Sequence, residues 1–310
     1  MFEQVLSEGP SYSELSDFYN MKIKPSEFPI QTNFVSVADA IMASDYFNAG
    51  NFQHFGINSL EDCLQVVPKV SAVLMCRFRD GELENTLLQC GRSPSCRYII
   101  VQTLIGDDGY VSADTLGALP ENIVRIYSKN VHYEHERLVP IPIGRDWRVT
   151  EEAFSSEFSR ASGEPPRCHT YMNFSLETHP SREELYQLLK NEPWVTASKP
   201  TAYRTYHKSH SQYVTEMADH RFTLSPIGKA VDCYRTWDAL FARSIPVLDK
   251  TAHSSLYQDL PAILVSDWSQ VNRAFLDQAY DQLTQQRFNL EKLTVKYWKQ
   301  LIQADAQANF

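Results

Sequence analysis

Long apolar segments are missing from this sequence. No run approaches the roughly 20 residues that a helix needs to cross a bilayer, and the first twelve residues lack the basic-then-apolar pattern of a secretory signal. The six cysteines include no Cys-x-x-Cys pair and no zinc-ligand spacing, so they read as small apolar residues of a reducing compartment. These absences predict a cytoplasmic protein without a transmembrane segment.

Positive charge is also in short supply. The 310 residues contain 29 lysines and arginines against 38 aspartates and glutamates, a net charge of -9. A chain of this kind has no overall attraction for nucleic acid or for an anionic membrane. We therefore expect no nucleic-acid partner, and any bound phosphate must be held locally by a few cations and backbone amides.

The motifs of several enzyme classes are absent. The sequence has no Gly-x-Ser-x-Gly elbow and no Walker loop, and no glycine fingerprint follows its first strand. No Asp-x-Asp pair stands at a predicted strand end. His132 and His135 lie beside Glu134 and Glu136, but their spacing suits neither a helical zinc pair nor a structural zinc site. We therefore expect no metal requirement.

The length and the 43% apolar content favour two domains of roughly 150 residues, because one hydrophobic core rarely organises so long a chain. The clearest strand of the first half is 97–103, which is β-branched and apolar like a strand buried on both faces. Further strands are expected at 72–78, 124–127 and 138–143, a helix at 60–68, a turn at 79–81 and a connector at 116–119.

The second half alternates strands and helices more regularly. Residues 145–167 separate it from the first half as a linker or an exposed excursion. The alternation predicts a parallel sheet, which binds ligands beyond the carboxyl ends of its strands. Strands are expected at 168–174, 221–224, 245–248 and 262–265. Helices are expected at 181–189, opened by a capping box of Ser181 and Glu184, at 232–242, and at 269–303 with a break near Phe288.

The loop after the strand 221–224 carries the strongest chemical signal. It leads into a helix for which Asp232 suits the N-cap position. Unpaired amides and the helix dipole make such a helix start suitable for binding phosphate. The loop residues of interest are Ser225, Pro226, Gly228 and Lys229.

Arg235 and Asp238 lie three residues apart on that predicted helix, so they share a face. The guanidinium can hold a diphosphate while the carboxylate holds ribose hydroxyls. The two residues can equally form an ordinary surface ion pair. The spacing alone leaves both interpretations open.

The whole segment resembles the donor-binding signature of exostosin-like glycosyltransferases. The matching residues are Leu224-Ser225-Pro226, Gly228, Asp232, Arg235-Thr236-Trp237, Ala239-Leu240 and Ile245-Pro246-Val247, followed by Leu256-Tyr257, Asp259-Leu260-Pro261 and Val265-Ser266-Asp267-Trp268. Upstream, Tyr171-Met172-Asn173-Phe174-Ser175 resembles the strand end that opens the family's second domain. The likeness covers about residues 95–270 and is strongest in the second half.

This resemblance implies an α/β fold of the GT-B type, with two Rossmann-like domains facing a cleft. Residues 1–150 would form the acceptor domain and 151–275 the donor domain, and a C-terminal helix in 276–310 would cross back to the first domain. The implied activity is sugar transfer from a nucleoside-diphosphate sugar, uridine-based in our interpretation, to a glycan hydroxyl. Asn173 and Ser175 join the expected donor-binding residues.

Three departures from the family pattern stand in the donor segment. Asp238 occupies the usual glutamate position, Tyr234 precedes the arginine where a histidine is common, and Lys229 interrupts a run of small residues. Lys229 can add a second cation for phosphate or can simply be exposed.

An inverting transfer needs a base to take the proton of the acceptor hydroxyl. Asp107 and Asp108 follow the carboxyl end of the strand 97–103, and one of them is the candidate; a solvated Asp-Asp-Gly turn is the alternative. Arg235, the helix start and Lys229 can neutralise the leaving diphosphate without metal.

Two other readings remain. A nucleotide-binding scaffold of a glycan-synthesis system that has lost turnover would explain the departures at Asp238 and Tyr234. A sugar-nucleotide epimerase is disfavoured by the missing glycine fingerprint. If the acceptor is membrane-bound, we expect peripheral contact with the membrane or with a partner.

Overall fold

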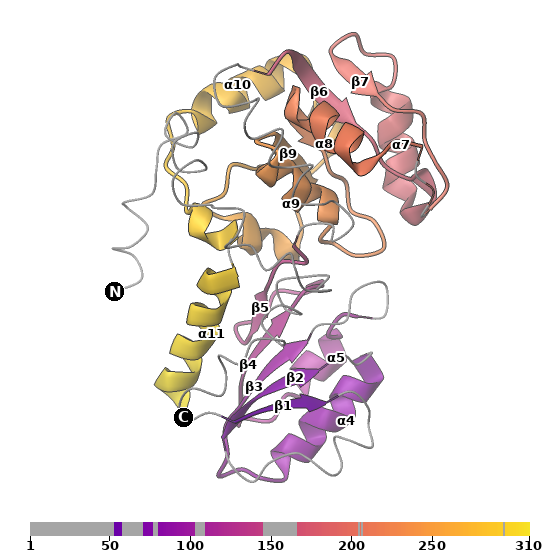
Figure 1. The fold of residues 1–310 in the computed structure, drawn as a ribbon. Coiled ribbons are helices and arrows are strands. Elements are labelled where there is room, and N and C mark those ends of the chain that lie inside the picture. The colour runs from indigo at the N-terminus through magenta and orange to yellow at the C-terminus, as the bar shows by residue number, and fades with distance from the viewer. Residues whose placement is uncertain are drawn as a thin grey trace.

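Two parallel sheets, one above the other in Figure 1, organise the molecule. The computed structural model describes residues 53–57, 71–76, 80–102, 109–144, 166–203, 205, 207–293 and 295–310. Within these ranges no helix combines the length and the apolar character needed to cross a membrane. The expected helix at 60–68 and most of the expected linker lie outside the described residues, so the domain boundary near 150 stays a prediction.

The first sheet has five parallel strands in chain order. They are β1 (Gln53–Ile57), β2 (Ala72–Cys76), β3 (Tyr98–Gln102), β4 (Ile123–Ser128) and β5 (Leu138–Pro140). Every residue of β3 is buried, as expected for a central parallel strand. The turn expected at 79–81 is wrong, because Asp80 begins the helix α4 (Asp80–Gly91). The expected connector lies within and just after the short helix α5 (Ala113–Gly117).

The second sheet has the order β10-β9-β8-β6-β7. Its strands are β6 (Cys168–Met172), β7 (Val195–Ala197), β8 (His220–Leu224), β9 (Ile245–Asp249) and β10 (Ile263–Val265). After β6 the chain adds β7 on one side and then returns to add β8 on the other side. The strand order therefore reverses between β6 and β8, and such a reversal opens a crevice at the carboxyl ends of the two strands.

The helices of the second domain start at other residues than the sequence patterns indicate. In α7 (Pro180–Leu189) the N-cap is His179, whose ring accepts from the Ser181 amide, so the expected capping box of Ser181 and Glu184 is wrong. Proline at the first helical position fixes this earlier start. The helix α9 (Tyr234–Phe241) has Cys233 as its N-cap without a side-chain bond, so Asp232 is not the cap.

The C-terminal region forms two helices, α10 (Arg273–Leu283) and α11 (Val295–Asn309), and buried Phe288 lies in the break between them. Figure 1 shows α11 descending beside the first sheet. There Asp305 accepts hydrogen bonds from Arg125 Nε at 3.0 Å and from the Tyr127 hydroxyl at 2.9 Å. The expected GT-B arrangement, with a C-terminal helix crossing back to the first domain, is confirmed.

Hydrophobic packing is continuous across the two domains. Val73, Ile99 and Val101 on one face of the first sheet belong to the same buried cluster as Trp298 and Ile302 of α11 and as the core of the second domain. The opposite face of the first sheet forms a separate cluster with α4 and α5. Helix α11 therefore covers one face of the first sheet and links the two domains.

Candidate functional site

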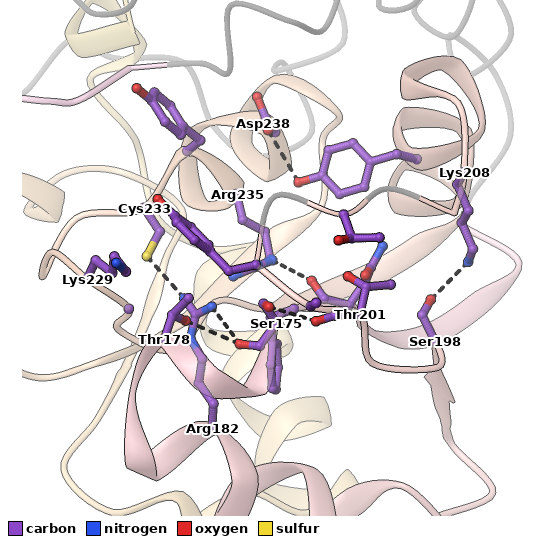
Figure 2. A pocket seen from close by; sticks show the side chains of 18 of the residues that line it. Ser175, Thr178, Arg182, Ser198, Thr201, Lys208, Lys229, Cys233, Arg235 and Asp238 are labelled. Carbon is purple, nitrogen blue, oxygen red and sulfur yellow. Dashed lines mark hydrogen bonds between the residues drawn. The ribbon is translucent and has the colours of Figure 1, made fainter. Parts of the chain in front are cut away.

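A cavity of about 390 Å³ lies beyond the carboxyl ends of β6 and β8, at the point where the strand order reverses. Its wall includes Asn173 to Ser175, which follow β6, and Gly228 to Asp232, which follow β8. Figure 2 shows Lys229, Arg182 and Arg235 around it, from three different segments of the chain. The cavity thus stands at the position where parallel α/β sheets bind ligands.

Arg235 lies in the first turn of α9 and lines the cavity. Its Nε donates to the main-chain carbonyl of Asn173 at 2.7 Å, and its guanidinium carbon lies 5.4 Å from the centre of the Phe174 ring. Its Nη1 atom is buried without a hydrogen-bond partner. A buried N–H group without a partner costs about 1–3 kcal/mol, which a bound acceptor atom would recover.

Arg182 of α7 is a second cation of the cavity, and the sequence analysis missed it. Its side chain is only 4% exposed and donates to three main-chain carbonyls: Ile227 at 2.7 Å, Pro226 at 2.9 Å and Ser175 at 3.1 Å. Burial lowers the pKa of Arg182 to about 10, and the charge of Arg235 acts in the same direction. The described residues place no carboxylate within salt-bridge distance of it.

The two guanidinium groups lie against the same aromatic ring. The carbon of the Arg182 group is 5.5 Å from the centre of the Phe174 ring, close to the 5.4 Å of Arg235. A signal for Arg182 was present in the sequence, since Arg182, Leu185 and Leu189 follow helical spacing and form one buried face of α7.

Gly228 makes room for Arg182. A Cβ atom at this position would stand 2.6 Å from Arg182 Nη2, far inside normal contact distance. Two other motif residues of this loop make hydrogen bonds that stabilise the loop. Ser225 Oγ shares a hydrogen bond of 2.9 Å with Thr236 Oγ1, and the Pro226 carbonyl accepts from Arg182. Ser225 and Pro226 therefore hold the loop in place without lining the cavity.

Lys229 and Ser175 lie at the rim of the cavity. The Lys229 ammonium stands 4.7 Å from the centre of the Tyr203 ring, and Lys229 is exposed although it lines the cavity. Ser175 Oγ donates to the Thr201 carbonyl at 2.7 Å and so ties the segment after β7 to the end of β6. His207 and His210 also line the cavity.

Asp238 lies one turn after Arg235 and is only 1% exposed, so the surface ion pair considered above is not what forms. Its Oδ2 accepts from the Tyr213 hydroxyl at 3.3 Å, and both residues line the cavity. Figure 2 draws this bond at the end of the cavity away from Arg182. The carboxylate and the phenol together form a polar end of the cavity, and Figure 2 shows Arg235 between this end and Arg182.

Asp232 joins the two domains. Its carboxylate accepts from the Trp237 indole at 2.9 Å, from the Tyr257 hydroxyl at 2.8 Å and from the amide of Ile143, a residue of the first domain, at 2.7 Å. His253 Nε2 lies 3.9 Å away. Burial, together with the Asp232 charge, raises the pKa of Tyr257 well above its usual value. Asp232 thus fixes the loop that the donor motif was expected to use.

The catalytic candidates Asp107 and Asp108 lie outside the described residues, so their position relative to the cavity stays a prediction. In the part of the chain that is described, no three His, Cys, Asp or Glu side chains form a group that could hold a metal ion. His135 Nδ1 instead accepts from the Arg137 amide at 3.1 Å, and His132 Nε2 stands 3.2 Å from Asn130 Oδ1.

Residues 166–310 match the family described as the RXYLT1 C-terminal domain. Among solved structures, an α1,3-fucosyltransferase is similar at 11% identity and a TM-score of 0.45, with 88% of this chain and 95% of that chain covered. An α,α-trehalose 6-phosphate synthase from Burkholderia multivorans is similar at 10% identity and a TM-score of 0.41, with 80% of this chain and 72% of that chain covered. The N-terminal domain of a Candida albicans trehalose-6-phosphate phosphatase is similar at 12% identity and a TM-score of 0.45, with 81% of this chain and 72% of that chain covered. A sequence comparison with curated proteins gives no match.

Proposed function

We propose that the chain is an exostosin-like glycosyltransferase of the GT-B type and that its cavity binds a nucleoside-diphosphate sugar. The match of residues 166–310 to the RXYLT1 C-terminal domain family supports the first part of this proposal. The sugar, carried by a uridine diphosphate in this proposal, passes to a hydroxyl of a glycan acceptor held by the first domain. Inversion at the anomeric carbon and independence of metal ions are part of the proposal.

The observation that carries this proposal is the pair of guanidinium groups on one ring in a chain of net charge -9. Holding two like charges side by side, one of them buried and the other partly buried, is unfavourable unless an anion joins them. A diphosphate brings two or more negative charges, and each charge-assisted hydrogen bond is worth about 1.5–3 kcal/mol. Arg235 Nη1 supplies a buried donor that such a ligand would use.

The opposite end of the cavity suits the nucleoside. Asp238 and the Tyr213 hydroxyl present an acceptor and a hydroxyl group to it, and ribose hydroxyls pair with both kinds of group. Because Asp238 lies one turn beyond Arg235 on α9, a ligand with its diphosphate at the arginines can place its ribose at the carboxylate. Asp238 is one methylene shorter than the glutamate that is usual at this position, so in this proposal the ribose hydroxyls lie correspondingly closer to α9.

Asp107 or Asp108 is proposed as the base that takes the acceptor proton, and the cations are proposed to stabilise the diphosphate as it leaves. Five cationic side chains line the cavity, namely Arg182, Lys199, Lys208, Lys229 and Arg235, and together they can offset the negative charge of a nucleoside diphosphate. We therefore expect sugar transfer to keep its rate after dialysis against EDTA. A rate that falls and returns with added Mg²⁺ or Mn²⁺ would contradict metal independence.

The donor site is tested by thermal unfolding with UDP, GDP, CDP and their sugar conjugates. Wild type should gain about 2.7 kcal/mol of stability when the ligand is present at a hundred times its dissociation constant. Arg235→Ala should lose this gain, whereas Arg273→Ala, an exposed arginine of α10, should keep it. No shift of the wild type with any nucleotide at millimolar concentration would overturn the proposal.

The scaffold reading keeps its two supporting observations, the aspartate at position 238 in place of the usual glutamate and Tyr234 where a histidine is common. A scaffold would bind the same nucleotide but transfer no sugar. Release of the nucleoside diphosphate from the stabilising sugar conjugate, measured with and without acceptor, separates the two readings.

A further inference from the structure

Three aromatic side chains of the first domain lie together next to the donor cavity. The ring centres of Tyr110 and His132 are 4.9 Å apart, and those of Tyr110 and Tyr133 are 6.5 Å apart. Tyr110 lies between β3 and α5, and the other two residues follow β4. The cluster of Tyr110, His132 and Tyr133 therefore gathers residues that follow two adjacent parallel strands, at the edge of a sheet where ligands bind.

The cluster is open to solvent. Tyr133 is 42% exposed and His132 is also exposed, although aromatic rings gain free energy by being covered. Scattered exposed rings are common in proteins, but here the rings of His132 and Tyr133 both lie against that of Tyr110, so the three form a continuous surface. Such a surface is suited to covering a flat, partly apolar ligand.

One side chain links this cluster to the loop that borders the donor cavity. Asn130 Oδ1 lies 3.2 Å from His132 Nε2 and accepts at 3.0 Å from the amide of Val231. Val231 stands between Ala230 and Asp232, which both line the cavity. The cluster thus lies two hydrogen bonds from the donor loop, within reach of a ligand that continues from the cavity.

We propose that Tyr110, His132 and Tyr133 form the subsite that holds an uncharged sugar ring of the glycan acceptor. One face of a pyranose carries C–H groups that pack on aromatic rings, while its hydroxyls pair with the tyrosine hydroxyls and the imidazole. Glu134 and Glu136 are exposed beside the cluster and would repel a sulfated sugar or a uronic acid. The inference rests on the proposed transferase function for the role of this sugar as acceptor.

Arg137 does not neutralise the charges of Glu134 and Glu136 at the surface, because main-chain carbonyl groups bind its guanidinium. Its Nη1 donates to the carbonyls of Pro120 and Ile123 at 2.9 and 3.1 Å, and its Nη2 donates to that of Leu119 at 3.3 Å. The Arg137 guanidinium is therefore engaged with the main chain. The cluster and its two glutamates present an aromatic, negatively charged surface.

Saturation-transfer NMR with methyl β-glycosides of xylose, galactose, glucose and glucuronic acid, without nucleotide, tests this subsite. At least one neutral glycoside should receive saturation from wild type, and the glucuronide should receive less. Tyr133→Ala should weaken the binding about fivefold, because one stacked ring is lost. Tyr133→Phe keeps the ring and should retain most of the binding. Phe310→Ala, an aromatic residue of similar exposure at the far end of α11, is the matched control and should change nothing.

The inference is overturned if no neutral glycoside binds, or if folded Tyr133→Ala and His132→Ala proteins bind as wild type does. Arg235→Ala separates this result from the donor site, since it should lose the nucleotide shift and keep the glycoside signal. A wild type that binds a neutral glycoside but no nucleotide would contradict the proposed function and leave the sugar subsite standing. A wild type that binds nucleotide but no neutral glycoside would overturn the subsite and leave the proposed function standing.

Discussion

The two domains present different chemistry around the site. The second domain surrounds its cavity with Arg182, Arg235 and Lys229 and uses main-chain carbonyls to orient the two arginines. The first domain offers aromatic rings and exposed glutamates beside that cavity. The difference is the one expected if the second domain binds a charged donor and the first a neutral acceptor, as proposed. Each prediction below changes one side while the other is measured.

The largest effect is expected from the base. If Asp107 or Asp108 takes the acceptor proton, the Asn variant of that residue should lose 10²- to 10⁴-fold in transfer rate, the usual contribution of a general base. Nucleotide stabilisation should stay at the wild-type level, because the donor site belongs to the second domain. Transfer that survives in both single variants and in the double variant would eliminate these aspartates and leave inversion without a base.

Asp232 should matter most for stability. Asp232→Ala leaves the Trp237 indole, the Tyr257 hydroxyl and the Ile143 amide without their acceptor, and we expect a loss of about 3 kcal/mol or more in the free energy of unfolding. Urea denaturation measures it, with exposed Asp281→Ala as the control, expected within about 0.5 kcal/mol of wild type. Equal stability of the two variants would show that the buried contacts do not join the domains.

Gly228→Ala should weaken the donor side alone. The added methyl group would collide with Arg182 Nη2 and displace the loop or the guanidinium, so nucleotide affinity should fall about tenfold, the equivalent of one charge-assisted hydrogen bond. Titration calorimetry measures the change. Gly117→Ala, whose added Cβ meets nothing within 4 Å, is the matched control and should bind as wild type does. Unchanged affinity in the Gly228 variant would mean that Arg182 does not shape the nucleotide site.

The smallest effect is expected at α11. Asp305→Ala removes the acceptor of Arg125 and Tyr127, and we expect a loss of about 1–2 kcal/mol in stability, because both bonds are only partly buried. Thermal unfolding measures it, and the increment that nucleotide adds should be the same as in wild type. A smaller nucleotide increment in this variant would mean that the donor site depends on the docking of α11.

The second domain was the easier one to predict from sequence, for a physical reason. Its strands and its donor segment follow patterns of residues close in the chain, so β8, α9 and β9 appear at nearly the expected residues, whereas its strand order was not predicted. In the first domain the sequence predicted β3 correctly, but it predicted a turn where α4 begins, because Asp80-Gly81 is also typical of turns. Local patterns could not distinguish a helix start from a turn at these residues.

Long-range contacts account for the errors in the site. Asp232 was expected as a helix cap, but one of its partners, Ile143, lies 89 residues away and has no local signature. Arg182 follows the buried face of α7, yet an arginine in an amphipathic helix is normally assigned to solvent. Its role depends on carbonyls about 45 residues further along the chain.

The central claim is that Arg182 and Arg235 bind the diphosphate of the donor. Calorimetric titration of wild type with UDP, UMP and uridine tests it most directly, together with Arg235→Ala. The account predicts that affinity rises with each phosphate and that Arg235→Ala removes most of the gain, while uridine binds both proteins equally. Equal affinity of wild type for uridine and UDP would contradict it.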